Sequence, residues 1–301
     1  MFFDFTARCA SGTPRFRWYW LEDHNPLSGN RKRRRIYNPN QPMRELHGQL
    51  IRYLRGLHVD RASSTGARPG SSPLRNVLRH KPRWTSWFPR FFFLIDISGA
   101  YANVDGEKLV KIILDHDQNL AGRELDVRAF LSQYCMSTEE GGLIVGAPAS
   151  PDLFNLYCEV LIDGEIRSLC RKYGLTYTRY LDDLTFSSSQ RIGKKKRQAL
   201  CAVIERAGFK LNQRKARVLD LAKGPVAING VGITRDGRCF LPRQAVRELR
   251  GLLHLALSGR LDRLSTIHGR MGVFKALTNL RFPTKTERRV LDMYRQLKKL
   301  S

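Results

Sequence analysis

The sequence predicts an α+β protein in which strands bearing acidic residues precede a basic helical region. Three observations predict this class. Residues 91–95 form a short apolar run that ends at Asp96, which is typical of a buried strand. Residues 176–188 alternate around an Asp-Asp pair at 182–183, which indicates a hairpin with the acids at its turn. From Leu241 onward, apolar residues recur at helical spacing among many Lys and Arg residues.

The first predicted helix covers 42–57, where four apolar residues recur at helical spacing. The next segment, 61–75, is rich in Gly, Ser and Pro and predicts a loop. The apolar strand at 91–95 follows this loop. The chain therefore reaches its first buried acid by way of a helix and a loop.

Two further helices are predicted between the strand and the hairpin. Asp105 precedes an apolar helical pattern, which is the position of an N-cap residue. Ser150 and Pro151 predict the start of the second helix, with Ser as the cap and Pro at the first helical position. Gly174 predicts its end. The change from a mixed pattern to basic helices predicts a domain boundary near residue 240.

Composition bounds the class of protein. The chain has 301 residues, of which 42% are hydrophobic, so it is neither a disordered tail nor a fibre. At ~150 residues per domain, this length suggests two domains. No apolar run approaches the ~18 residues of a membrane helix, so we expect no membrane partner. The six cysteines form no Cys-x-x-Cys pair, which argues against a zinc site and favours a cytoplasmic location.

The charge predicts a polyanionic partner. Lys and Arg total 53 against 27 Asp and Glu, which gives a formal net charge of +26. Basic side chains that neutralise phosphates release condensed counterions, so nucleic acid is the expected partner. The basic residues are spread along the whole chain rather than gathered in one tail, which favours a groove built from several segments.

Two acidic sites predict metal chemistry. Asp96 at the end of a buried strand is costly unless a positive group satisfies it, and the adjacent acids at 182–183 repel each other. A pair of Mg²⁺ ions satisfies both sites and supports in-line phosphoryl transfer. Asp-Asp pairs are also common in solvated turns, so either site alone has a purely structural explanation.

Four segments resemble the ordered motifs of the reverse transcriptases. Residues 93–101 (Phe-Leu-Ile-Asp-Ile-Ser-Gly-Ala-Tyr) resemble motif A, and 142–156 resemble motif B. The Tyr-Leu-Asp-Asp run at 180–183 is similar to the Tyr-x-Asp-Asp box of motif C, and 208–215 resemble motif D. The resemblance covers roughly 30–280 and keeps the order of the family.

The resemblance implies a right-hand polymerase with fingers, a palm built on an antiparallel sheet, and a helical thumb. It places an N-terminal extension and the fingers at 1–90, the palm at 91–240 with a fingers insertion at about 106–140, and the thumb at 241–301. The activity that it implies is RNA-directed DNA polymerisation, in which two Mg²⁺ ions assist the addition of dNTPs to a primer.

The resemblance also assigns the catalytic centre. Asp96 and Asp182 correspond to the principal Mg²⁺ ligands, with Asp183 in support and the carbonyl of Ile97 as a further oxygen ligand. Tyr101 falls where the family places the steric gate that rejects ribonucleotides. A core aromatic is the alternative role for this tyrosine.

The remaining site residues are expected to bind substrate. Arg34 corresponds to the fingers arginine that grips the triphosphate, because a guanidinium fork suits phosphate oxygens. Lys215 corresponds to the motif D lysine that protonates the pyrophosphate leaving group. Ala147 and Pro148 offer small side chains where a base pair lies close. A solvated basic turn is the alternative for Arg34, and a backbone-binding cation the alternative for Lys215.

Two segments resemble those of retron reverse transcriptases. Residues 76–80 (Asn-Val-Leu-Arg-His) are similar to the Asn-Ala-x-x-His segment of these enzymes, and 228–230 (Ile-Asn-Gly) partly match their Val-Thr-Gly segment. A retron enzyme implies a cognate structured non-coding RNA, RNA-linked single-stranded DNA for anti-phage defence, an RNA–DNA duplex, and an effector protein as a candidate partner. The segment 143–146 (Leu-Ile-Val-Gly) lacks the Gln of the usual Leu-Pro-Gln-Gly, so another defence-associated or diversity-generating enzyme stays an alternative.

Two other interpretations stay open. A non-catalytic RNA-binding module with a polymerase-like fold is one, although it has no reason to keep three costly acids. The first 30 residues, which include Trp18, Tyr19 and Trp20, have no role in the resemblance, and they either pack on the fingers or hold RNA by stacking.

Overall fold

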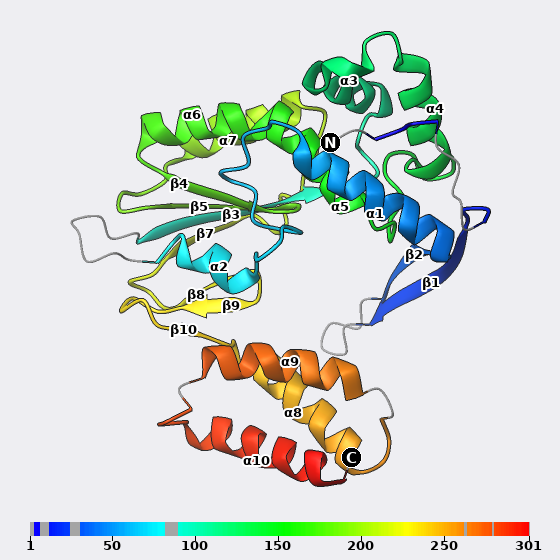
Figure 1. Cartoon of the computed structure of the whole chain (residues 1–301). Helices are drawn as coiled ribbons and strands as arrows, with labels where there is room; N and C mark the ends of the chain where they lie inside the picture. Colours follow the sequence, from blue (N-terminus) through cyan, green and yellow to red (C-terminus); the bar gives the residue numbers. More distant parts are fainter. Residues whose placement is uncertain are drawn as a thin grey trace. The chain divides into compact units, whose positions relative to one another are not determined.

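A computed structural model describes the chain at 3–6, 12–24, 31–81, 90–261, 264–278 and 280–300. It divides into two compact units (Figure 1). The first comprises 1–71, 93–186 and 192–217, and the second comprises 72–92, 187–191 and 218–301.

The first unit is an antiparallel sheet with helices, preceded by a long hairpin. Its elements are β1 (Phe16–His24), β2 (Arg31–Pro39), α1 (Gln41–Gly56), most of β3 (Phe91–Ser98), α3 (Gly106–His116), η1 (Gln118–Leu120), α4 (Glu124–Tyr134), α5 (Ser150–Cys158), the π-helical turn η2 (Glu159–Asp163), α6 (Gly164–Tyr173), β4 (Thr176–Tyr180), most of β5 (Asp183–Ser188), α7 (Lys194–Arg206) and β6 (Lys210–Leu211).

The sheet places the acids at one point. The strand order is β4-β5-β3-β6, so β3 lies between the hairpin strand β5 and the short strand β6. Six consecutive residues of β3 are buried, as the apolar run predicts. Figure 1 shows α6 and α7 along one face of this sheet. Phe186 stacks on both Phe93 and Tyr177, with centroids 5.8 and 5.0 Å away, which builds the core from neighbouring strands.

Most predicted elements are confirmed, including the helix at 42–57 and the hairpin at 176–188. The loop predicted at 61–75 ends earlier, because Ser72 caps a short helix, α2 (Pro73–Leu78), by accepting from the Arg75 backbone N–H. Asp105 caps α3 by accepting from two backbone N–H groups, and Gly174 ends α6 at a φ of 65°. The predicted cap at Ser150 is wrong. Ser150 is the first helical residue, and its hydroxyl donates to the Ile144 carbonyl at 2.7 Å, because the preceding loop folds back on the helix.

The second unit combines small sheets with a helical bundle. It contains α2, most of β7 (Arg217–Asp220), which pairs with β3, and a three-stranded sheet of order β10-β9-β8. The helical pattern predicted from Leu241 onward is confirmed by α8, α9 and α10, which enclose an apolar core of their own. The remaining elements are β8 (Val226–Ile228), β9 (Val231–Ile233), β10 (Cys239–Phe240), α8 (Arg243–Leu257), α9 (Leu264–Leu277) and α10 (Lys285–Leu300).

The two retron-like segments meet within the second unit. Asn76 donates through its side-chain amide to the Asn229 side-chain oxygen at 2.5 Å. The fully buried His80 ring has its Nδ1 atom 2.7 Å from the Ser187 hydroxyl. Both segments therefore act at least in packing. Among the described residues, no helix has the length and apolarity that crossing a membrane requires.

Candidate active site

A cleft of about 540 Å³ opens in the first unit where β3 ends. The structure brings six of the predicted site residues to its walls, and they come from four separate stretches of the chain. These six residues are Arg34, Asp96, Ile97, Tyr101, Asp182 and Lys215.

Asp96 is buried and paired with a cation. Its side chain is 11% exposed, and one carboxylate oxygen lies 2.9 Å from the Lys215 ammonium. The same oxygen accepts from the Asn212 side chain at 3.4 Å, while the Asn212 backbone N–H donates to the Asp96 carbonyl at 2.8 Å. Since β6 pairs with the end of β3, the turn that follows β6 carries Lys215 to the acid. The lysine itself is 63% exposed, so it remains accessible from the cleft.

Asp182 lies in the β4–β5 turn, beside the end of β3. Its backbone carbonyl accepts from the Ile97 N–H at 3.0 Å, which ties the turn to the strand that carries Asp96. Burial raises the pKa of the Asp182 carboxyl, and the negative charge of Asp96 raises it further. Lys215 and Arg34 act in the opposite direction. Asp182 thus shares one cleft with Asp96, Lys215 and Arg34, and the charge of each of these three residues influences its pKa.

The turn has a left-handed backbone that neighbouring groups hold in place. Leu181 has a φ of 55°, a value that non-glycine residues seldom adopt. The guanidinium of Arg179 donates to the Leu181 carbonyl at 3.3 Å. Gly66 approaches closely on the other side, since an added Cβ there would lie 2.7 Å from the Leu181 nitrogen. A side chain at position 66 therefore has no room beside the turn.

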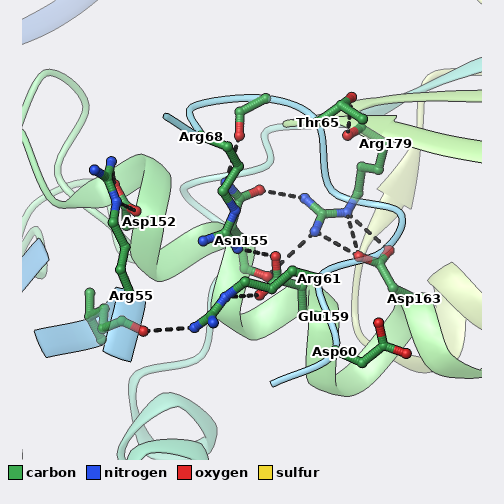
Figure 2. Close-up of polar contacts among 12 residues, drawn as sticks. Arg55, Asp60, Arg61, Thr65, Arg68, Asp152, Asn155, Glu159, Asp163 and Arg179 are labelled. Carbon is green, nitrogen blue, oxygen red and sulfur yellow. Dashed lines mark hydrogen bonds and ion pairs between the residues drawn. The ribbon is translucent and has the colours of Figure 1, made fainter. Parts of the chain in front are cut away.

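Arg179 is the centre of a buried polar network (Figure 2). It donates to both carboxylate oxygens of Asp163, the shortest distance being 2.8 Å, and to the Asn155 side-chain oxygen at 2.8 Å. The Tyr177 hydroxyl also donates to Asp163, at 2.7 Å. Arg179 and Asp163 are both fully buried, so each neutralises the other's charge away from water. The network links α5 and η2 to β4, the strand that precedes the turn with Asp182.

A second group of ion pairs lies nearby in the same unit (Figure 2). Arg55 pairs with Asp152 at 2.8 Å, and the loop residues Arg61 and Arg68 pair with Glu159. Burial raises the pKa of Glu159, while the neighbouring Arg68 lowers it. The Gly/Ser/Pro-rich loop therefore supplies arginines to the interior, which its composition alone does not predict.

Sequence reasoning missed Arg179. The signal was an arginine among β-forming residues in the predicted strand, two positions before the motif C turn residue Leu181; this residue and the two strand residues before it are buried. Its partners, Asp163 and Asn155, lie 16 and 24 residues earlier. Such distant partners cannot be identified from local periodicity.

The other predicted residues have distinct positions. Tyr101 lines the cleft while its ring packs edge-on against Phe154, with centroids 5.4 Å apart, so it faces both cleft and core. Burial raises the pKa of the Tyr101 hydroxyl, and the negative charge of Asp182 raises it further. Asp183 begins β5, and Ala147 and Pro148 precede α5; these three are described but are not among the cleft-lining residues. From their neighbourhood, Val145 lines the cleft.

The donor set suits a hard divalent cation. Within the described ranges, no three His, Cys, Asp or Glu side chains gather as a metal cluster. The Asp96 and Asp182 carboxylates nevertheless face the same cleft and repel each other electrostatically, and Asp96 already holds the Lys215 ammonium. Carboxylate oxygens gathered in this way are what Mg²⁺-like ions bind, with water or substrate oxygens completing the shell.

Comparison with known proteins gives a family match and two related sequences. The profile of the family described as reverse transcriptase (RNA-dependent DNA polymerase) matches residues 24–234. The retron Ec86 reverse transcriptase of Escherichia coli is 25% identical over 289 residues, which cover 95% of this chain and 82% of the relative. The retron Mx65 reverse transcriptase of Myxococcus xanthus is 37% identical over 112 residues, which cover 37% of this chain and 25% of that protein.

Solved structures give a match of the fold. The telomerase of Candida albicans, solved with a TWJ fragment of telomeric RNA, has a TM-score of 0.52 at 13% identity. The match covers 94% of this chain and 56% of the telomerase chain. The apo telomerase of Candida tropicalis gives a TM-score of 0.51 at 13% identity, covering 86% of this chain and half (50%) of that one. Together with the family match, these structures confirm the predicted right-hand polymerase fold.

Proposed function

The chain belongs to the reverse transcriptase family of RNA-dependent DNA polymerases, and from this premise we propose that it extends a primer along a structured RNA in the cleft around Asp96 and Asp182. The observation that carries this proposal is the convergence of Asp96, Asp182 and Lys215 on one cleft. These residues lie far apart in the chain, and sequence motifs predict each of them.

In the proposed reaction, the primer 3′-hydroxyl attacks the α-phosphate of a dNTP and pyrophosphate leaves. Arg34, exposed on β2 at the cleft, grips the triphosphate through its planar guanidinium. Lys215 donates a proton to the leaving pyrophosphate, and its ion pair with Asp96 keeps the ammonium at the cleft. Tyr101 rejects ribonucleotides with its ring, which packing against Phe154 holds in place.

Reverse transcriptases work with divalent metal ions, and we propose Mg²⁺ at this site. The carboxylates of Asp96 and Asp182 would hold it, with the Ile97 carbonyl and Asp183 as further oxygen ligands. When bound, the metal supplies Lewis acidity and neutralises charge on the phosphates. The raised pKa of Asp182 supports this assignment, because a cation relieves the repulsion from Asp96 that contributes to the shift.

The similarity to retron enzymes, which the sequence predicts, supports a finer proposal about partners. The match to the Ec86 enzyme extends over nearly the whole chain, at 95%. We propose that the template is a cognate structured non-coding RNA and that the product is RNA-linked single-stranded DNA used in anti-phage defence. The thumb, proposed at 241–301, would hold the RNA–DNA duplex through its basic residues. We propose an effector protein as a further partner of the chain.

Primer extension tests the polymerase proposal. The purified chain is given an RNA template with an annealed DNA primer and either all four dNTPs or all four NTPs, with Mg²⁺ present. We expect DNA whose sequence is the complement of the template, and no extension with NTPs. Template binding without extension would indicate the non-catalytic RNA-binding module instead. Products that ignore the template sequence would contradict RNA-directed synthesis.

A further inference from the structure

The β1–β2 hairpin carries an aromatic and basic surface that the proposed reaction does not use. Trp18 and Trp20 are 50% and 43% exposed, although large aromatic side chains are usually well buried. Trp20 pairs directly with Arg35 across the hairpin, and Arg33 is two residues away on the same side of β2. Because alternate residues of a strand share a face, these four side chains form one surface, called the Trp–Arg face below.

The side chains of the Trp–Arg face are ordered by one another. The Arg33 guanidinium lies 4.1 Å from the ring centroid of Trp20, and that of Arg35 lies 4.2 Å from the centroid of Trp18. The two indoles meet edge to face at 6.1 Å. Cation–π contacts of this kind fix ring orientation without covering the whole ring. The surface is therefore pre-organised while about half of each indole stays accessible.

The Trp–Arg face is continuous with the cleft. Trp20, Arg33 and Arg35 line the same cleft as Asp96 and Asp182. The hairpin is attached there by the Tyr37 N–H, which donates to the Val145 carbonyl at 2.9 Å. A nucleic-acid strand bound in the cleft would therefore lie next to the Trp–Arg face.

We propose that the Trp–Arg face binds unpaired bases of the template strand by stacking on Trp18 and Trp20. This inference rests on the proposed function, since it assumes a nucleic-acid template in the cleft. Every base offers a flat π-face, so stacking tolerates any sequence, whereas paired bases hide those faces in a duplex. Arg33 is exposed and supplies the phosphate contact. Arg35 is largely covered and already pairs with Glu139, so it supports the ring of Trp18.

The opposite face of the same strand provides a matched control. Tyr19 and Leu21 alternate to that side and are 50% and 48% exposed, which is as much as the two tryptophans. Neither residue lines the cleft. Replacing Tyr19 and Leu21 by alanine removes exposed apolar side chains, as replacing the two tryptophans does, but it leaves the Trp–Arg face intact.

The test measures binding of template–primer duplexes to the full chain. One RNA template carries an unpaired overhang of about ten nucleotides, and a second carries an abasic overhang of equal length and charge. For the wild type, the overhang with bases should bind about tenfold more tightly than the abasic one. The Trp18→Ala/Trp20→Ala variant should lose this preference, and Tyr19→Ala/Leu21→Ala should keep it.

Several results would overturn the proposal. The first is that the wild type binds the abasic overhang as tightly as the overhang with bases. The second is that the Trp18→Ala/Trp20→Ala variant still prefers the overhang with bases. The third is that the Tyr19→Ala/Leu21→Ala control loses this preference to the same extent as the tryptophan variant. Trp18→Phe/Trp20→Phe retains flat rings and should keep most of the preference, which separates stacking from a loss of folding. Primer extension by the wild type is read separately. A failure of extension rejects the proposed function, whereas successful extension with no preference for bases rejects the Trp–Arg face alone.

Discussion

Two groups of arginines in the first unit show how burial separates structural from binding roles. Arg179 is fully buried, and its partners are a carboxylate, an amide oxygen and a backbone carbonyl. Arg33 is exposed, and its contact is the face of an indole ring. The first guanidinium is satisfied by the protein itself. The second is oriented by the protein but keeps its charge facing water.

This difference changes how the count of 53 Lys and Arg residues should be interpreted. Arg55 also pairs with Asp152, and Arg61 and Arg68 share Glu159, so these guanidiniums are engaged by carboxylates within the first unit. A count of basic residues includes these internal pairs, and it overstates the surface that meets nucleic acid. The structure identifies Arg33, Arg34 and Lys215 as cations at the cleft.

The largest expected effect on stability comes from removing the buried arginine. Arg179→Met leaves the Asp163 carboxylate buried without its main partner, so we expect about 3–5 kcal/mol less stability. The matched change Arg33→Met removes an exposed side chain and should alter stability by less than about 0.5 kcal/mol. Urea unfolding of both variants measures the difference. Equal stability losses would break the distinction between the two groups.

Two buried histidines also make the stability of the protein depend on pH. Burial lowers the pKa of His47 to about 4 and that of His80 to about 3. In the unfolded chain both histidines have a pKa of 6.5. As the pH falls below 6.5, they therefore bind protons in the unfolded chain while they stay neutral in the folded chain. Stability should therefore be full above pH 6.5 and fall with acidification, by about 2 kcal/mol per histidine from pH 7 to pH 5. Unfolding of wild type and His47→Gln across this range checks the slope, and an unchanged slope in the variant would refute the assignment to His47.

The smallest expected effect concerns salt. If Arg33 contacts a template phosphate, Arg33→Met should lower the slope of log affinity against log salt by about 0.7, the value for one phosphate of a single strand. Titrations with the base-bearing overhang at several salt concentrations measure it. A parallel line displaced to weaker affinity would show that Arg33 acts without releasing a counterion.

Much of the architecture was predictable because it depends on local patterns. Periodicity identifies β3 and the helical character of the chain after Leu241, and the Asp-Asp pair identifies the β4–β5 turn. The ordered motifs predict that Asp96, Asp182 and Lys215 come together. These features follow from short segments in which each residue type has few alternative roles.

What was missed depends on tertiary partners. The Ser150 cap fails because the Ile144 carbonyl, six residues earlier, binds the hydroxyl that local preference assigns to the helix. Arg179 is invisible to periodicity because its partner Asp163 lies on another element. Ala147 and Pro148 lie beside the cleft-lining Val145 without lining the cleft themselves, a difference that depends on how the loop before α5 folds.

The most direct test of the central claim is single-turnover incorporation of one dNTP on an RNA template by wild type, Asp182→Asn and the exposed control Asp236→Asn. The asparagine at 182 keeps the shape of the side chain but removes the charge that the site uses. We predict that Asp182→Asn slows incorporation by about a thousandfold or more while Asp236→Asn leaves it unchanged. Incorporation by Asp182→Asn at the wild-type rate would contradict catalysis at this cleft.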